Sequence, residues 1–142
     1  MLTHLIFSTK NWEPLLVGND LRQRTHAYLA AVLKDTQCPA LIVGGTADHV
    51  HVLCQLAKTQ SISNIVEHLK ASSSKWLKTQ GSRTFSWQRG YGAFSVSQSH
   101  GESVTSYIEK QEEHHRRISF EEEFRAILKR YRVAFDERYV WD

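Results

Sequence analysis

Two histidines stand two residues apart in the stretch DHVHVL, at His49 and His51. This stretch is typical of a β-strand, in which side chains two positions apart lie on the same face. The alternate face, which carries Val50 and Val52, should pack against the core, so the histidines are expected to point away from that core, side by side. Two neighbouring imidazoles can bind one divalent ion, because neutral imidazole is a common metal ligand. The spacing also fits an exposed histidine pair without any chemical role.

A second set of reactive side chains occurs in the stretch ESVTSYIEKQEEHHRR, which has helical spacing. Tyr107 and Gln111 are four residues apart, so they should share one face of the predicted helix. A tyrosine oxygen can attack a phosphodiester as a covalent nucleophile, and a divalent ion at the phosphate would neutralise charge and orient the group. The Gln111 amide oxygen is a candidate third ligand. Spacing alone does not choose between it and the alternatives, which are several carboxylates and His68, His100, His114 and His115.

The elements that must position these side chains follow in the order β-α-β-β-α-β, with further helices appended. Runs rich in β-forming residues predict strands over 3–9, 40–45, 49–56 and 93–97. Helical periodicity predicts helices over 19–36, 61–80 and about 102–117, and a last helix that begins at Ser119. Asn19 or Asp20 is the expected N-cap of the first helix, and the second helix is expected to start at Ser61 or Ser63. The order predicts an α+β fold of the ferredoxin-like (RRM-like) split βαβ type, in which an antiparallel sheet has helices on one face and a C-terminal catalytic helix.

The composition is that of one folded domain, expected to span residues 1–142. A hydrophobic fraction of 41% and a charged fraction of 23% argue against disorder. No apolar run approaches the roughly 18 residues that a membrane-spanning helix needs, and no secretion signal opens the chain. We therefore expect a cytoplasmic protein without a membrane partner. Cys38 and Cys54 form no CxxC pair and are expected to be reduced thiols.

At these residues the chain resembles the single-tyrosine HUH transposases of small bacterial insertion sequences (the IS two-hundred type), including relatives associated with REP palindromes. The matching stretches are HLIFSTK, GGTADHVHVL, WQRGYGAFSVSQS, VTSYIEKQEEHH and SFEEEF. They occur in family order and cover nearly the whole chain. The pair of motifs HxH and YxxxQ, in that order and at this chain length, is far more specific than HxH alone.

The resemblance implies that His49, His51 and Gln111 are ligands of Mg²⁺ or Mn²⁺. It implies that Tyr107 is the catalytic nucleophile, which cuts single-stranded DNA and leaves a 5′-phosphotyrosine bond and a free 3′-hydroxyl. It further implies recognition of an imperfect DNA hairpin and a homodimer, in which the tyrosine helix of one subunit can complete the histidine site of the other.

A basic run from Lys70, within the second predicted helix, to Arg89, beyond it, is interleaved with aromatic residues, a composition suited to single-stranded nucleic acid. Trp76, Phe85 and Trp87 could stack on bases, or could belong to the core. Tyr91 is a rival nucleophile in a loop flanked by glycines, ranked below Tyr107. The residues predicted to contact the DNA backbone are Lys70, Lys75, Arg83 and Arg89, with Arg116 and Arg117 at the catalytic helix.

Two other functions remain open at this point. One is a catalytically inactive or domesticated relative that binds single-stranded nucleic acid, although both histidines, the tyrosine and the glutamine are present. The other is an unrelated zinc hydrolase that uses His49, His51 and a third histidine.

Overall fold

The computed structural model describes residues 1–115 and 118–130. Arg116, Arg117 and the tail FDERYVWD lie outside the described residues, so the DNA contacts predicted for the two arginines stay predictions. The main elements are β1 (Leu2–Ser8), α1 (Asn19–Asp35), β2 (Ala40–Gly45), β3 (His49–Gln55), α2 (Ile62–Thr79), β4 (Gly92–Val96), α3 (Gly101–Glu109), α4 (Gln111–His114) and α5 (Phe120–Arg130). Two short 3₁₀ turns lie at Lys10–Trp12 and Gln98–His100.

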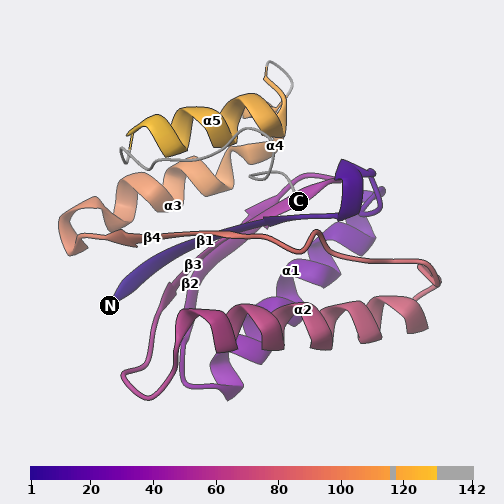
Figure 1. Ribbon diagram of the computed structural model, residues 1–142, viewed down its shortest axis with the longest axis horizontal. Coiled ribbons are helices and arrows are strands. Elements are labelled where there is room, and N and C mark those ends of the chain that lie inside the picture. Colours follow the sequence, from indigo (N-terminus) through magenta and orange to yellow (C-terminus); the bar gives the residue numbers. More distant parts are fainter. Residues whose placement is uncertain (116–117, 131–142) are drawn as a thin grey trace.

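The four strands form one antiparallel sheet in the order β2-β3-β1-β4. Helices α1 and α2 cover one face, whereas α3, α4 and α5 lie over the other (Figure 1). The predicted β-α-β-β-α-β order and the α+β class are confirmed. The strand with the histidines, β3, is an inner strand, which places both of them near the middle of the sheet.

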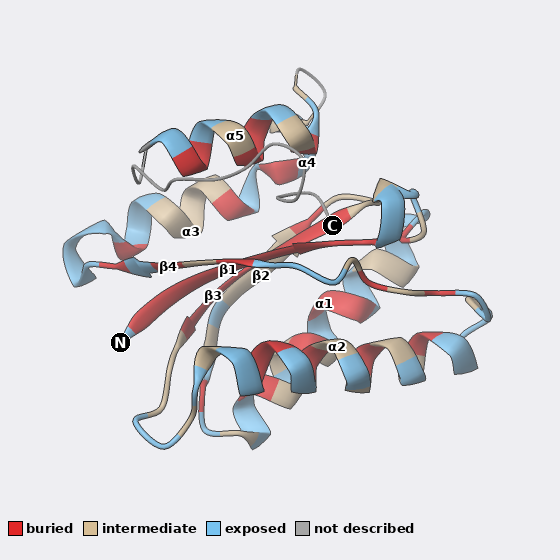
Figure 2. Ribbon diagram, viewed as in Figure 1, coloured by how far each residue is buried: buried red, intermediate tan, exposed pale blue. Residues whose placement is uncertain are grey.

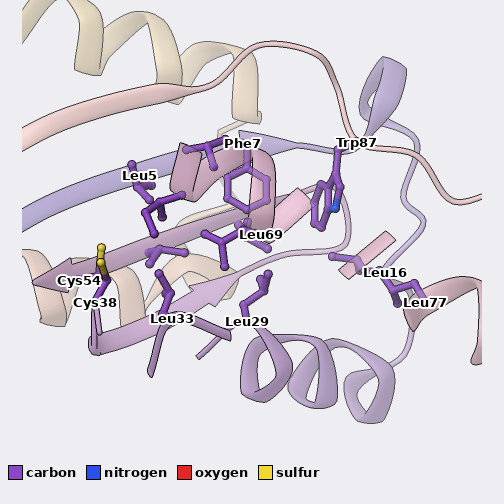
Figure 3. Close-up of a cluster of buried hydrophobic side chains, with 14 of the residues drawn as sticks. Leu5, Phe7, Leu16, Leu29, Leu33, Cys38, Cys54, Leu69, Leu77 and Trp87 are labelled. Atoms are coloured by element: carbon purple, nitrogen blue, oxygen red, sulfur yellow. The ribbon is translucent and has the colours of Figure 1, made fainter. Parts of the chain in front are cut away.

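The main core lies between the sheet and the first two helices (Figure 3). Leu5 and Phe7 of β1 meet Leu29 of α1 and Leu69 of α2 there, all at most 1% exposed. The alternation of β3 explains its share of this core, because Val50, Val52 and Cys54 point to the same side. Cys38 and Cys54 are free and buried.

The opposite face of the sheet is also covered, by apolar side chains of the last three helices. Phe120, Phe124 and Ile127 of α5 pack on Ile6 and Phe94. A second group on this face consists of Leu2, Leu53, Val96 and Ile108. Consequently β1 is buried along its whole length on both sides (Figure 2). The face of the histidines is therefore an interior layer.

Helix boundaries differ from the sequence expectations at two places. The N-cap of α1 is Gly18, with φ +92°, instead of Asn19 or Asp20, because a positive φ there suits glycine. The helix expected over 102–117 is interrupted at Lys110, whose ψ of 15° separates α3 from α4. The other caps follow the sequence: the Ser61 hydroxyl accepts from the Asn64 amide, and the Ser119 hydroxyl accepts from the Glu122 amide at 3.2 Å.

Within 1–115 and 118–130, no helix combines the length and the apolar character needed to cross a membrane.

Candidate active site

Strand β3 presents both histidines to the layer between the sheet and α3–α5. His51 lies opposite Ile6 of β1 and Gly44 of β2, and its ring centroid is 5.2 Å from that of His49. Both side chains are completely buried. The prediction that they lie side by side, away from the Val50 face, is confirmed. The surroundings are polar, however, since carboxylate, amide and phenol groups line the space above them.

Each histidine is oriented through its Nδ1 atom. The Nδ1 of His49 lies 2.7 Å from the Asp48 carboxylate, and the Nδ1 of His51 lies 2.9 Å from the Nε2 of His4. Burial lowers the pKa of His51 to about 4 and that of His4 to about 3, so both rings are neutral at neutral pH. The two Nε2 atoms are thereby left facing the same polar pocket. Ligand histidines in metal sites are commonly held in this way by a second partner at the other nitrogen.

Tyr107 reaches the histidines because α3 packs directly on β2. A Cβ atom at Gly44 would lie 2.8 Å from the Ile108 side chain and from its carbonyl oxygen, so only glycine permits this approach. The Tyr107 ring then stands edge-on to His51, with 5.7 Å between their centroids. The predicted nucleophile and the predicted ligands therefore belong to one pocket within a single chain.

Gln111 is buried at the start of α4, and its amide joins two partners. Its Oε1 lies 3.0 Å from the Nε2 of His49, and its Nε2 donates to the Glu123 carboxylate at 2.9 Å. The break at Lys110 separates Gln111 from the helix of Tyr107, yet both side chains still reach the same pocket. The amide oxygen therefore points at the histidine pair, as a third ligand would.

Glu123 lies at the centre of the pocket and is not among the predicted site residues. This residue is 2% exposed, and its carboxylate accepts hydrogen bonds from Tyr107 and Gln111 and contacts His51 at 3.0 Å. Burial by itself would raise the pKa of Glu123, but contacts with His115 and His51 outweigh burial and hold that pKa well below its usual range. The burial of Glu123 could have been inferred from helical spacing, since Glu123 lies on the same face of α5 as the apolar residues Phe120 and Ile127.

The donor set fits a divalent cation. His49 faces an oxygen at both ring nitrogens, Asp48 at Nδ1 and Gln111 at Nε2, although a neutral imidazole donates from only one of them. Gln111 donates from its amide nitrogen to Glu123, so its oxygen, which cannot donate, faces His49. A cation between the Nε2 of His49 and the Gln111 oxygen would satisfy both lone pairs.

A cavity of about 830 Å³ adjoins this pocket. It is bounded by β1, β4 and helices α3 to α5, and its lining includes His4, Tyr107, His114 and Glu123. The lining also includes Val96, Ser103 and Ile127. The space is large enough for a nucleotide-sized group beside the Tyr107 ring.

Comparison with known proteins identifies the family. Residues 1–111 match the family model described as "Transposase IS200 like". The chain belongs to the IS200-like transposase family. A search of curated proteins found no match.

Solved structures share the fold of this transposase. One is a candidate transposase from Deinococcus radiodurans R1, with a TM-score of 0.60 and 23% identity over 78% of this chain and 90% of that chain. Another is the REP-associated tyrosine transposase bound to a REP hairpin, with a TM-score of 0.62 and 14% identity over 80% of this chain and 67% of that chain. At these identities the likeness concerns the fold.

The basic residues predicted to bind DNA belong to α2 and to the segment that follows it in the transposase. Lys75, Arg83 and Arg89 are exposed, and their DNA contacts stay predictions. Lys70 is half-buried, and its ammonium donates to the carbonyl oxygens of Gln88, Arg89 and Gly90 at 2.7, 3.2 and 2.9 Å. Lys70 therefore already has a structural role in holding this loop.

The aromatic residues of the same segment are mostly structural. Phe85 and Trp87 are 1% and 8% exposed and belong to the main core, so of the two alternatives left open by the sequence the structure supports the core. Trp76 stacks on Tyr28 with 4.7 Å between ring centroids. The rival nucleophile Tyr91 has its ring 5.8 Å from the Lys70 ammonium.

Proposed function

We propose that this transposase cuts and rejoins single-stranded DNA with Tyr107 as its nucleophile. The observation that carries the proposal is the position of the Tyr107 ring, edge-on to His51 at 5.7 Å, in the pocket that also holds His49 and Gln111. A phenol beside two imidazoles and an amide is a suitable set for phosphoryl transfer, and it is an unusual set for a structural core.

The proposed reaction is a transesterification. The Tyr107 hydroxyl loses its proton as its oxygen forms a bond to the phosphorus, the bond between phosphorus and the 3′ oxygen breaks, and this 3′ oxygen takes up a proton to become a free 3′-hydroxyl. In the rejoining step, a 3′-hydroxyl attacks the 5′-phosphotyrosine and releases the tyrosine. Before the reaction, the hydrogen bond from Tyr107 to Glu123 fixes the direction of the hydroxyl.

His49, His51 and Gln111 are proposed to hold Mg²⁺ or Mn²⁺. When bound there, the ion would neutralise charge on the non-bridging phosphate oxygens and orient the phosphate for in-line attack. Asp48 and His4 keep the two imidazoles in place for this role, through the contacts at Nδ1.

The proposed substrate is an imperfect DNA hairpin near the end of a mobile element. It is supported by the fold shared with a REP-associated tyrosine transposase that was solved with a REP hairpin. We also propose a cytoplasmic homodimer, in which each site is assembled from its own chain. A mixture of Tyr107→Phe and His49→Ala proteins tests this point, since sites shared between subunits would restore cutting and sites within one chain would not.

Covalent trapping tests the proposed chemistry. The full chain is incubated with labelled single-stranded hairpin DNA and Mg²⁺ or Mn²⁺, and the products are separated on a denaturing gel. We expect a protein–DNA adduct that Tyr107→Phe abolishes and Tyr91→Phe retains. His49→Ala and His51→Ala should remove cutting and leave hairpin binding largely intact. An inactive relative would shift the hairpin under native conditions without any adduct. A zinc hydrolase would not depend on Tyr107.

A further inference from the structure

The carboxylate of Glu123 stands among the histidines from a part of the chain that the family match does not include. The match ends at residue 111, and α5 begins at Phe120. The Oε1 atom of Glu123 lies 3.0 Å from the Nε2 of His51 and 3.6 Å from the Nε2 of His49. The apolar residues Phe120 and Phe124 on either side are buried on the sheet, so the position of the carboxylate is fixed by packing.

His115 presents a second ligand-type atom to the same space. Its side chain is 9% exposed, and its ring centroid is 4.4 Å from that of His49. The Nε2 lies 3.0 Å from the Oε1 of Glu123, but among the described residues it has no partner with the geometry of a hydrogen bond. A buried ring nitrogen left unsatisfied is costly, which indicates that another group belongs at this position.

The ligand atoms of His49, His51 and Glu123 have the spacing of one coordination sphere, and those of His114, His115 and Glu123 form a second such group that shares the same carboxylate. Imidazole nitrogens and carboxylate oxygens bind divalent ions at about 2.0 to 2.2 Å, so neighbouring ligand atoms around one ion are roughly 3.0 to 3.5 Å apart. The Oε1 of Glu123 lies 3.0 to 3.6 Å from the Nε2 atoms of His49, His51 and His115, and the Gln111 oxygen lies 3.0 Å from that of His49.

We propose that Glu123 and His115 bind the catalytic divalent ion together with His49, His51 and Gln111. This inference rests on the proposed function, because it extends the ligand set of the same site. A carboxylate with three imidazoles forms a mixed nitrogen and oxygen site, a set that first-row transition ions such as Mn²⁺ accept. The second oxygen of Glu123 accepts from Tyr107 and Gln111, so one carboxylate links the metal site to the nucleophile.

The competing explanation is that Glu123 takes the place of the ion and must leave before the ion binds. The two explanations predict different changes in metal affinity when the Glu123 carboxylate is removed. Removal of a ligand weakens metal binding, whereas removal of a competitor leaves it unchanged or strengthens it. Glu122 offers a matched control, since it is the adjacent glutamate on α5 and is exposed. His68 on α2 is an exposed control for His115.

The test is Mn²⁺ binding to the full chain, measured by titration calorimetry without DNA. We expect Glu123→Gln and His115→Ala each to weaken the affinity at least tenfold, and Glu122→Gln and His68→Ala to change it less than twofold. Circular dichroism shows whether each variant is folded. Pulsed EPR of Mn²⁺ on the unaltered protein provides a second readout, with couplings from three imidazole nitrogens expected.

Unchanged or tighter Mn²⁺ binding in Glu123→Gln would overturn the role of Glu123, and coupling to only two imidazoles would overturn that of His115. These outcomes are distinct from failure of the proposed function. If the wild-type protein forms the tyrosine adduct while the affinities do not change, only the extended ligand set is wrong. If the affinities fall as expected but no adduct forms, the tyrosine chemistry is wrong and the metal assignment stands.

Discussion

The hydroxyl of Tyr107 donates a hydrogen bond to the carboxylate of Glu123, which lies 16 positions further along the chain on another helix. Since the same carboxylate contacts His51, the proposed nucleophile and the histidine strand are connected through α5. The last helix is therefore part of the candidate active site. Its apolar side chains, among them Phe124, hold it on the sheet face that carries the histidines.

The contact between Asp48 and His49 predicts that Asp48 acts on metal affinity as a positioning residue. Asp48→Ala removes the carboxylate partner of Nδ1 and leaves only the Thr46 hydroxyl, at 2.9 Å, so the His49 ring is held less firmly. Loss of such a partner typically costs 10-fold to 100-fold in metal affinity. We expect a decrease of about this size in Mn²⁺ affinity by calorimetry. Asp48→Asn should lose less, because its amide oxygen can still accept from Nδ1.

A matched control for this prediction is Asp35→Ala, at the exposed end of α1. It should leave the Mn²⁺ affinity within twofold of the wild-type value. If Asp48→Ala bound Mn²⁺ as tightly as the wild type while remaining folded, the orienting role of Asp48 would be refuted.

Much of the architecture could be predicted from local patterns. Alternation along residues 49–55 placed Val50 and His51 on opposite faces, and both assignments hold because strand geometry fixes them. The distance between Tyr107 and His51 could not be predicted, since it depends on how closely α3 approaches β2. That close approach is possible because Gly44 has no side chain, and the periodicity of hydrophobic residues gives no sign of it.

Glu123 and His115 illustrate a different limit of the sequence. A glutamate within the run Glu121–Glu123 has the appearance of a solvated helix start, and only its position between Phe120 and Phe124 marks it as buried. The partners of Glu123 come from β3, α3 and the end of α4, so its role is a matter of tertiary contacts. The burial of the sheet face that carries the histidines could not be predicted for the same reason, because it depends on where α5 packs.

The close approach at Gly44 predicts a strong effect of one added methyl group. Gly44→Ala would place a Cβ atom 2.8 Å from the side chain and the carbonyl oxygen of Ile108, so α3 must shift away from β2. Overpacking of this kind costs about 1 to 3 kcal/mol, and denaturant unfolding should show that loss. Adduct formation should fall as well, because the shift of α3 moves Tyr107 away from the histidines.

Gly101→Ala is the comparison for Gly44→Ala. A Cβ atom there would meet only Leu2, at an ordinary 3.5 Å, and the backbone of Gly101 is already helical. Alanine should therefore be neutral or stabilising by up to about 1 kcal/mol. Equal losses of stability in the two variants would show that crowding at Ile108 is not the cause.

The buried imidazole of His26 predicts a loss of stability in acid. Burial first, and then the nearby Arg22, lower the pKa of His26 from 6.5 to about 4, and its Nε2 has no hydrogen-bond partner among the described residues. Because the folded pKa lies below the unfolded one, the neutral ring stabilises the fold above pH 6.5, and this contribution is lost as the pH falls toward 4. The loss should amount to roughly 3 kcal/mol.

Denaturant unfolding at pH 7.0, 5.5 and 4.5 measures this dependence. His26→Leu cannot be protonated, so its free energy of unfolding should decline less steeply with acid than that of the wild type. Part of the decline should remain, because burial also lowers the pKa of His4 to about 3. Identical pH profiles for the wild type and His26→Leu would exclude His26 as a source of acid sensitivity.

Lys70 and Lys75, both predicted DNA contacts on α2, should respond differently to mutation. Lys70 donates to three carbonyl oxygens of the loop 88–90, so Lys70→Met should lower the free energy of unfolding by about 1 to 2 kcal/mol.

Lys75 is exposed, and Lys75→Gln should change stability by less than about 0.5 kcal/mol. If Lys75 contacts a phosphate, its loss should reduce the slope of log affinity against log salt by about 0.7 for a single strand. Hairpin binding measured at several salt concentrations gives this slope, and a slope equal to that of the wild type would remove Lys75 from the DNA interface.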